Sequence, residues 1–262
     1  MGRGGAGPHR RAGAAALGPG GGVGKLQRTI LRPAAAELPA PLPEVLRLLG
    51  YREGRTRLGA RDLALVERGI ALTREAAAPA ASASYCAVTV AEDRVSAAVP
   101  GVAWQSRSLA RLLAGADAAS LVAVTLGAGV DELIRDLFAR EEFALATIVD
   151  AAGSALVHGL AEWVRGALLQ EAEAGAAAGV TLTPLYGPGY GDWKVEEQAA
   201  LAVLAGGDAI GLRCTETCYL VPQKSLVGLL GWLPPGGRDR TAAGCARCTL
   251  ADCAYRVRTS RR

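Results

Sequence analysis

The sequence predicts an α+β fold in which helices pack against a mixed or antiparallel sheet. Half of the 262 residues are apolar, which is too large a share for a wholly disordered chain. The apolar residues are mostly Ala, Leu and Val, and only 5% of the chain is aromatic, so we expect aliphatic side chains on helices to fill the core. This composition disfavours a large all-β protein. Short β-prone runs between the helical segments nevertheless predict a sheet.

Four segments show helical patterning. Apolar residues recur at helical spacing through 60–78, which predicts an amphipathic helix. Shorter helices are expected at 108–115 and at 131–140. In the helix at 131–140, the negative charge of Asp131 in the first turn complements the helix dipole. Residues 142–175 predict either one long helix or two helices joined near Gly153, and a Gly- and Ala-rich linker follows.

The β-prone runs are short and bounded by turn residues. YCAVTV and RVSAAV are separated by Ala-Glu-Asp, a pattern typical of a hairpin. LVAVTLG is apolar throughout, which predicts a strand that is buried on both faces. We expect the strands of the sheet near 85–98, 119–126, 209–220 and 225–232.

The chain divides into a leader, one domain and a tail. Residues 1–40 are rich in Gly, Pro and Arg, which predicts a disordered leader. Residues 41–256 are expected to form a single compact domain whose last segment is rich in cysteine. Residues 257–262 form a basic tail.

The net charge of +4 does not indicate a nucleic-acid partner. Ten of the 29 Lys and Arg residues lie in 1–36 and 256–262, which leaves 19 basic against 25 acidic residues in between. Asp150, His158 and Glu162 interrupt the longest apolar stretch, so we expect no membrane span. The amino-terminal residues lack the compact apolar region of a secretory signal, and we expect a cytoplasmic protein.

The segment YGPGYGDWKVEEQ, residues 186–198, concentrates glycine and aromatic residues. We expect its main chain to approach a ligand closely and Tyr186, Tyr190 and Trp193 to offer flat apolar faces. A nucleoside-like or macrocyclic ligand would suit such a loop. Polar groups in apolar surroundings need partners, and a ligand is one candidate partner for three residues further along, Thr215, Glu216 and Ser225.

The order of these motifs resembles the reactivation domain of cobalamin-dependent methionine synthase, which binds S-adenosylmethionine. The shared order is a Pro-Gly-Tyr loop, a Thr-Glu pair on a strand, and Pro-x-x-Ser-x-x-Gly. The segments DAAGSALVHGLAEWV and VTLGAGVDELIRDL are similar to stand-alone relatives of that domain, so the resemblance covers roughly residues 41–256. It implies an activation-domain-like fold and a set of ligand-binding residues, namely Glu162, Pro188, Gly189, Tyr190, Thr215, Glu216 and Ser225.

The resemblance also implies a reaction. The family domain docks on the corrinoid of a methyltransferase, a reductase or flavodoxin supplies one electron, and S-adenosylmethionine remethylates the cobalt. Tyr190 is expected to face the corrin and is the catalytic candidate. The implied partner is cobalamin-dependent methionine synthase or another corrinoid methyltransferase, and the implied setting is methionine biosynthesis.

One position departs from the family pattern. Leu185 stands where the family usually has an arginine, whose guanidinium suits a bidentate grip on the methionine carboxylate. The resemblance therefore leaves two alternatives open beside reactivation. The first alternative is a non-catalytic docking module for a corrinoid protein, without S-adenosylmethionine binding, and the second is a metal-containing electron-transfer protein.

The cysteines form a possible metal site near the carboxy terminus. In CARCTLADC a two-residue gap lets two thiolates reach one metal, and a further cysteine upstream would complete a four-sulfur tetrahedron for zinc or an iron–sulfur cluster. The alternative is that these residues are ordinary thiols. Cys86 and Cys214 lie on expected strands, where we expect small core residues. The four proposed ligands are Cys218, Cys245, Cys248 and Cys253.

Overall fold

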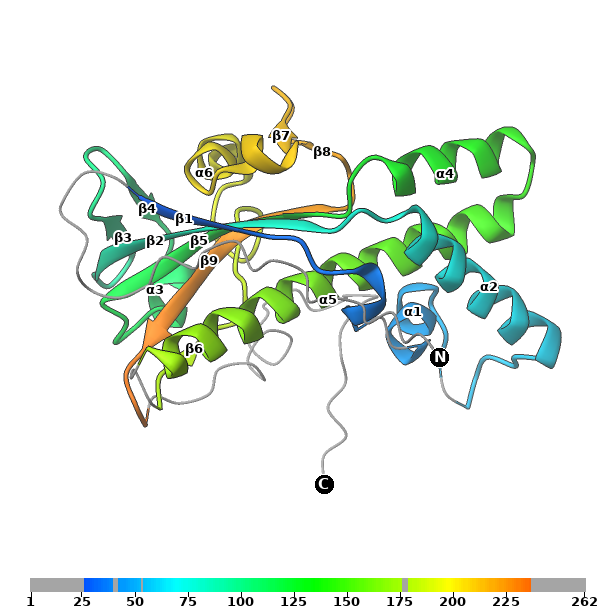
Figure 1. Ribbon diagram of the computed structural model, residues 1–262, viewed down its shortest axis with the longest axis horizontal. Coiled ribbons are helices and arrows are strands. Elements are labelled where there is room, and N and C mark those ends of the chain that lie inside the picture. The colour runs from blue at the N-terminus through cyan, green and yellow to red at the C-terminus, as the bar shows by residue number, and fades with distance from the viewer. Residues whose placement is uncertain (1–25, 40–41, 53, 176–178, 237–262) are drawn as a thin grey trace, which may run out of the picture.

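The structure is a computed structural model that describes residues 26–39, 42–52, 54–175 and 179–236. Its centre is an antiparallel sheet with the spatial order β4-β3-β2-β5-β9-β6, and β1 pairs with β2 beside this path. The predicted α+β class is confirmed (Figure 1). The strands are β1 (Gln27–Leu31), β2 (Ala80–Val90), β3 (Arg94–Ala97), β4 (Ala103–Gln105), β5 (Ala118–Thr125), β6 (Thr181–Leu182) and β9 (Ser225–Leu233).

Strand β2 pairs with three other strands of the sheet. It pairs with β5 from Ala80 to Ala87, while its other edge is shared between β1 and β3. Side chains alternate between the two faces of a strand, so Ala81 and Ala83 enter one apolar cluster and Cys86 enters the other. Strand β5 is buried along its whole length, which explains its uninterrupted apolar sequence.

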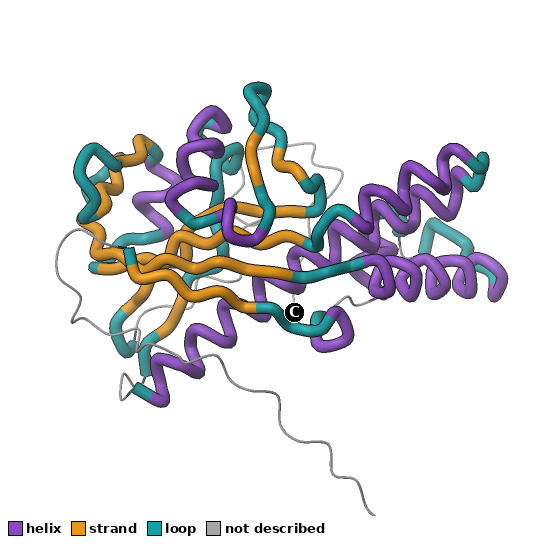
Figure 2. Tube along the Cα trace, turned by 45° about the horizontal axis from the view of Figure 1, so that its top comes forward, coloured by secondary structure: helices purple, strands orange, loops and turns teal. Residues whose placement is uncertain are grey.

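One face of the sheet is covered by the long helix α5 (Phe143–Ala174). It is a single helix of 32 residues, so the alternative of two helices joined near Gly153 is wrong. Figure 2 shows α5 running across the sheet and continuing beyond it among the other helices of this side. These are α1 (Leu42–Leu48), α2 (Ala60–Ala76) and α4 (Gly129–Ala139).

Helix α5 is also long and apolar enough to cross a membrane by length and composition alone. However, 67% of its most apolar eighteen-residue window is buried inside the protein, as is usual for a core helix. Its buried residues contact the sheet and the neighbouring helices, which accounts for their apolar character.

The opposite face carries smaller elements. Figure 1 shows α6 and the β7–β8 hairpin on the side of the sheet away from α5. The apolar cluster on this face includes Trp104, Leu109, Trp193 and Leu201. The elements here are α3 (Arg107–Leu112), α6 (Gln198–Leu204), β7 (Arg213–Cys214) and β8 (Leu220–Val221).

Two sequence expectations need correction. Residues Gln27–Leu31, assigned to a disordered leader, form β1 because the free edge of β2 provides backbone hydrogen-bonding groups for it. Residues 209–220 do not join the main sheet: the 3₁₀ turn Gly207–Ile210 precedes β7, which pairs only with β8 in a separate two-stranded sheet. The hairpin between β2 and β3 is confirmed, with the Ala91 amide donating to the Arg94 carbonyl at 2.8 Å.

Candidate functional site

The Pro-Gly-Tyr loop begins at the edge of the main sheet. Tyr186 pairs with Leu229 of β9 through two backbone hydrogen bonds of 3.1 and 2.8 Å. A Cβ on Gly187 would lie 2.2 Å from the carbonyl oxygen of Val227, and one on Gly228 would lie 2.6 Å from that of Tyr186. The close main-chain approach expected from the glycines is therefore an approach to the protein's own strand, and it fixes where the loop starts.

The loop then closes on itself. The Gly189 amide donates to the Trp193 carbonyl at 2.8 Å, and the Trp193 amide donates to the Tyr190 carbonyl at 3.0 Å. Pro188 is buried, whereas Gly189 and Tyr190 are exposed. The Pro-Gly-Tyr motif thus forms a compact turn with Tyr190 at its outer side.

The three aromatic residues of the loop have different roles. Trp193 is only 2% exposed, stacks on Tyr186 with ring centroids 6.3 Å apart, and donates from its indole nitrogen to Glu197 at 3.0 Å. Tyr190 is 44% exposed and its ring centroid lies 5.6 Å from that of Tyr186. Trp193 is therefore a core residue and not an open face, while Tyr190 remains available for contact. Partial burial raises the pKa of the Tyr190 phenol.

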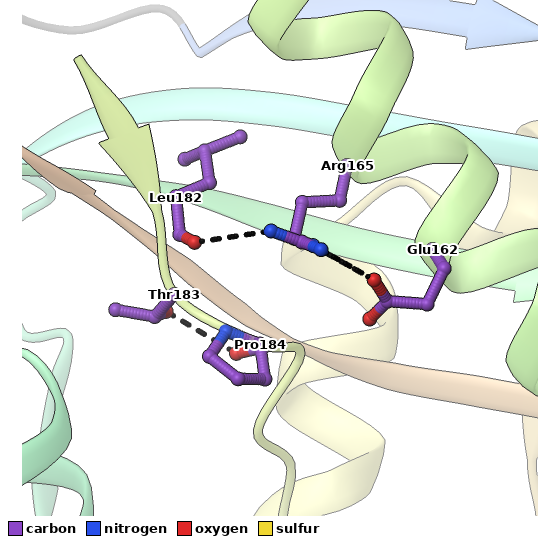
Figure 3. A network of polar contacts seen from close by, with 5 residues as sticks. All are labelled: Glu162, Arg165, Leu182, Thr183 and Pro184. Atoms are coloured by element: carbon purple, nitrogen blue, oxygen red, sulfur yellow. Dashed lines mark hydrogen bonds and ion pairs between the residues drawn. The ribbon is translucent and has the colours of Figure 1, made fainter. Parts of the chain in front are cut away.

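Glu162 lies on α5, close to the strand that leads into the loop. Arg165, one turn further along, donates to Glu162 Oε2 from Nε at 2.9 Å and from Nη2 at 2.7 Å (Figure 3). The Nη1 atom of Arg165 lies 3.5 Å from the carbonyl oxygen of Leu182 in β6. Arg165 is the better shielded partner, because its side chain is 23% exposed against 50% for Glu162. This pair connects α5 to the chain just before the loop.

Leu185 directly precedes the loop. Its side chain is half-buried and packs against the apolar cluster that α5 forms with the sheet. The position where the related domain usually has an arginine is thus occupied by a core contact. The nearby guanidinium is instead that of Arg165, which enters from the helix.

Thr215 and Glu216 lie in the turn between β7 and β8, and their expected place on a strand is wrong. The Thr215 hydroxyl accepts a hydrogen bond from the Tyr219 amide at 3.0 Å, so it closes the turn. Glu216 is exposed. Gln198, at the start of α6, donates to the Cys218 carbonyl at 2.7 Å and holds the turn against that helix.

Ser225 is buried at the start of β9. Its hydroxyl oxygen lies 2.7 Å from the carbonyl oxygen of Pro222 and 2.8 Å from the hydroxyl oxygen of Thr125. These protein contacts supply the partners that a buried hydroxyl requires. Its position is four residues before Leu229, where the loop meets β9.

The cysteines are only partly within the described residues. Cys245, Cys248 and Cys253 lie outside them, so the four-cysteine metal site stays a prediction. Among the residues that the structure describes, no group of three or more His, Cys, Asp or Glu side chains could hold a metal ion. Cys86 is buried as expected, whereas Cys214 is half-buried, with burial raising the pKa of its thiol.

Two charged residues in or near the loop were not predicted from the sequence. Arg165 could have been recognised as a helical i,i+3 partner of Glu162. Asp192 had no local signal, because its contacts are with Ser106, Arg107 and Ser108, more than eighty residues away in the sequence.

A solved structure described as the crystal structure of the MetH reactivation domain bound to AdoHcy has the same fold. The match covers 82% of this chain and 80% of that chain, with a TM-score of 0.57 and 14% sequence identity. No family model matches the sequence, and no curated protein matches it. The resemblance seen in the motifs is thus confirmed at the level of the fold.

Proposed function

We propose that this protein binds S-adenosylmethionine and serves the reductive reactivation of a cobalamin-dependent methyltransferase similar to methionine synthase. The observation that carries the proposal is the fold shared with the MetH reactivation domain, whose structure contains AdoHcy. AdoHcy is what remains of S-adenosylmethionine once its methyl group has left. The compact turn that presents Tyr190 beside β9 supports the proposal from this chain's own geometry.

The charges near the loop complement those of the ligand. S-adenosylmethionine carries a positive sulfonium, a positive amino group and a negative carboxylate. Glu162 is half exposed and would accept from the amino group, while Arg165 would donate to the carboxylate in place of the family arginine absent at Leu185. Tyr190 would then lie toward the corrin of the partner.

The proposed reaction needs a partner and a reductant. A flavodoxin-like protein would supply one electron to cobalt(II) in the partner's corrin. The resulting cobalt(I) would supply the electron pair for a new bond to the ligand's methyl carbon, while the bond between that carbon and the sulfonium sulfur would break and leave AdoHcy. The contribution of this chain is to bind the sulfonium ligand, orient its methyl group and dock on the corrin.

One observation favours a second candidate function. Leu185 stands where the family usually has an arginine, so no guanidinium grips the ligand from that position. Four apolar or aromatic residues are exposed on the loop, α6 and the β7–β8 turn, as expected for a docking surface: Tyr190, Val195, Val203 and Tyr219. A docking module that binds a corrinoid protein without S-adenosylmethionine would keep this surface and lose the ligand.

Isothermal titration of the purified chain with S-adenosylmethionine and with AdoHcy separates the two functions. The reactivation proposal expects both to bind, and Glu162→Gln to weaken S-adenosylmethionine binding while the melting temperature is kept. Absence of heat for both ligands, together with retained binding to a cobalamin-loaded methionine synthase, would overturn the proposal in favour of the docking module.

A further inference from the structure

Asp192 joins the Pro-Gly-Tyr loop to a distant helix. Its carboxylate accepts three hydrogen bonds, from the Ser106 hydroxyl at 2.6 Å, the Arg107 amide at 2.9 Å and the Ser108 amide at 3.0 Å. All three donors lie at the beginning of α3. The Ser106 hydroxyl oxygen in turn accepts from the Leu109 amide at 3.0 Å, as the N-cap of that helix.

The donors at the start of α3 explain why this position suits a carboxylate. The first amides of a helix have no partner within the helix, and the aligned peptide dipoles favour a negative charge there. Asp192 satisfies two of these amides from outside the helix, and Ser106 satisfies a third. Although burial acts in the opposite direction, the hydrogen bonds from Ser106, Ser108 and Arg107 hold the pKa of Asp192 well below its usual range. We call these hydrogen bonds between Asp192 and the start of α3 the Asp192 clamp. Its carboxylate stays charged throughout the physiological pH range.

The clamp acts directly on the turn that presents Tyr190. Gly191 separates the two residues at a φ of +57°, and a Cβ there would lie 2.4 Å from the Tyr186 hydroxyl and 2.7 Å from the Ser108 hydroxyl. The turn thus packs closely between the side chain of Tyr186 and the start of α3. Tyr186 fixes one end of the turn at β9, and Trp193 anchors the other end in the core.

We propose that Asp192 is a positioning residue, which fixes the Tyr190 turn against the start of α3 and so holds Tyr190 ready for its ligand. The inference rests on the proposed function for the identity of that ligand. The position of the turn itself does not depend on it. Without the hydrogen bonds of Asp192, the turn keeps its two ends but loses its attachment to α3, so binding would have to order the turn again.

A double-mutant cycle tests whether Asp192 acts through Tyr190. The variants are Asp192→Ala, Tyr190→Ala and the pair, each titrated with S-adenosylmethionine. Asp192→Ala is expected to weaken binding by about tenfold, which corresponds to about 1.4 kcal/mol. In the Tyr190→Ala background the same change should have little further effect, because the positioned residue is already absent. Equal affinity of Asp192→Ala and wild type, or an undiminished loss in the Tyr190→Ala background, would overturn the inference.

Controls separate positioning from general stability. Asp208 is an exposed carboxylate 3.7 Å from Arg28 on another part of the same face, and Asp208→Ala should leave S-adenosylmethionine affinity unchanged. Asp192→Glu should restore part of the affinity, whereas Asp192→Asn keeps the shape but not the charge. If Asp192→Ala fails to fold, Asp192→Asn provides the same cycle.

Hydrogen exchange gives a readout that does not need the ligand. The amides of Gly187 and of residues 189–193 should exchange faster in Asp192→Ala than in wild type, while those of β5 should not change. If wild type binds no S-adenosylmethionine, the proposed function fails but this measurement still decides the inference. Unchanged exchange across 187–193 would show that the clamp does not hold the turn.

Discussion

Replacing Tyr190 with alanine should abolish most of the proposed activity at little cost in stability. Tyr190 is 44% exposed, and its ring has a tilted contact with Tyr186 at 5.6 Å. An aromatic pair of this kind contributes about 1 kcal/mol beyond burial. For a domain of this size that loss would lower the melting temperature by about 2–4 °C.

Trp193 provides the matched comparison from the same loop. It is 2% exposed, contacts both Trp104 and Tyr186, and hydrogen-bonds to Glu197. Truncation of a buried aromatic residue to alanine costs about 3–5 kcal/mol. Trp193→Ala should therefore destabilise the protein several times more than Tyr190→Ala, although the two residues are three positions apart.

The assay measures thermal unfolding and activity on the same preparations. Activity is the rate at which cobalt(II) is remethylated when the protein is mixed with a cobalamin-dependent methionine synthase, a reductant and S-adenosylmethionine. Tyr190→Ala should melt within a few degrees of wild type and show a strongly reduced rate. A wild-type rate, or outright unfolding, would refute the assignment of Tyr190 to the ligand-facing side of the loop.

Four further predictions have defined outcomes. Leu185→Arg should tighten S-adenosylmethionine binding in calorimetry if the loop keeps the family geometry, and equal affinity would show that it does not. Asp150→Ala should lower the free energy of unfolding in urea by about 2 kcal/mol, because it removes the carboxylate 2.7 Å from the buried Lys224 ammonium. Lys224→Met should lower it by less, because no buried charge is then left without its partner. Equal losses of unfolding free energy in the two variants would contradict this reasoning. Cys245→Ser should release bound zinc or iron in metal analysis of anaerobically purified protein, and metal-free wild type would end the metal hypothesis. Burial raises the pKa of the Cys86 thiol from 9.0 to about 11, so the thiol of the unfolded chain ionises at a lower pH than that of the folded chain. The free energy of unfolding should therefore fall as the pH rises from 9.0 to about 11. In urea titrations, Cys86→Ala should show a smaller fall over this pH range, and an unchanged fall would exclude Cys86 as its cause.

The periodicity of the sequence was sufficient for most of the regular elements. A continuous apolar run can be buried on both faces only in the middle of a layered fold, which is where β5 lies. The helical spacing of apolar residues likewise predicted α2 and α5, because one side of each must face the core. The resemblance in motif order then indicated the correct fold despite 14% sequence identity to the solved domain.

Elements that depend on a distant partner could not be predicted in this way. The five residues Gln27–Leu31 follow a Gly-rich stretch and become a strand only because β2 offers a free edge. In the opposite case, residues 209–220 look β-prone, but only the short strands Arg213–Cys214 and Leu220–Val221 form, and they pair with each other in a separate hairpin held by Gln198 of α6. β-propensity reports fitness for a sheet and does not specify which strand is the neighbour.

Dependence on distant partners also decides which features of the candidate site could be predicted from the sequence. The glycine and proline residues of the sequence indicated a tight loop around Tyr190, and the spacing of Glu162 and Arg165 on one helix permits their ion pair. Only the tertiary structure decided that Trp193 is a core residue and that Leu185 packs against the apolar cluster between the sheet and the helices. It also brought Asp192 to the start of α3, since a hydrogen bond requires donor and acceptor within about 3 Å and sequence separation does not fix that distance.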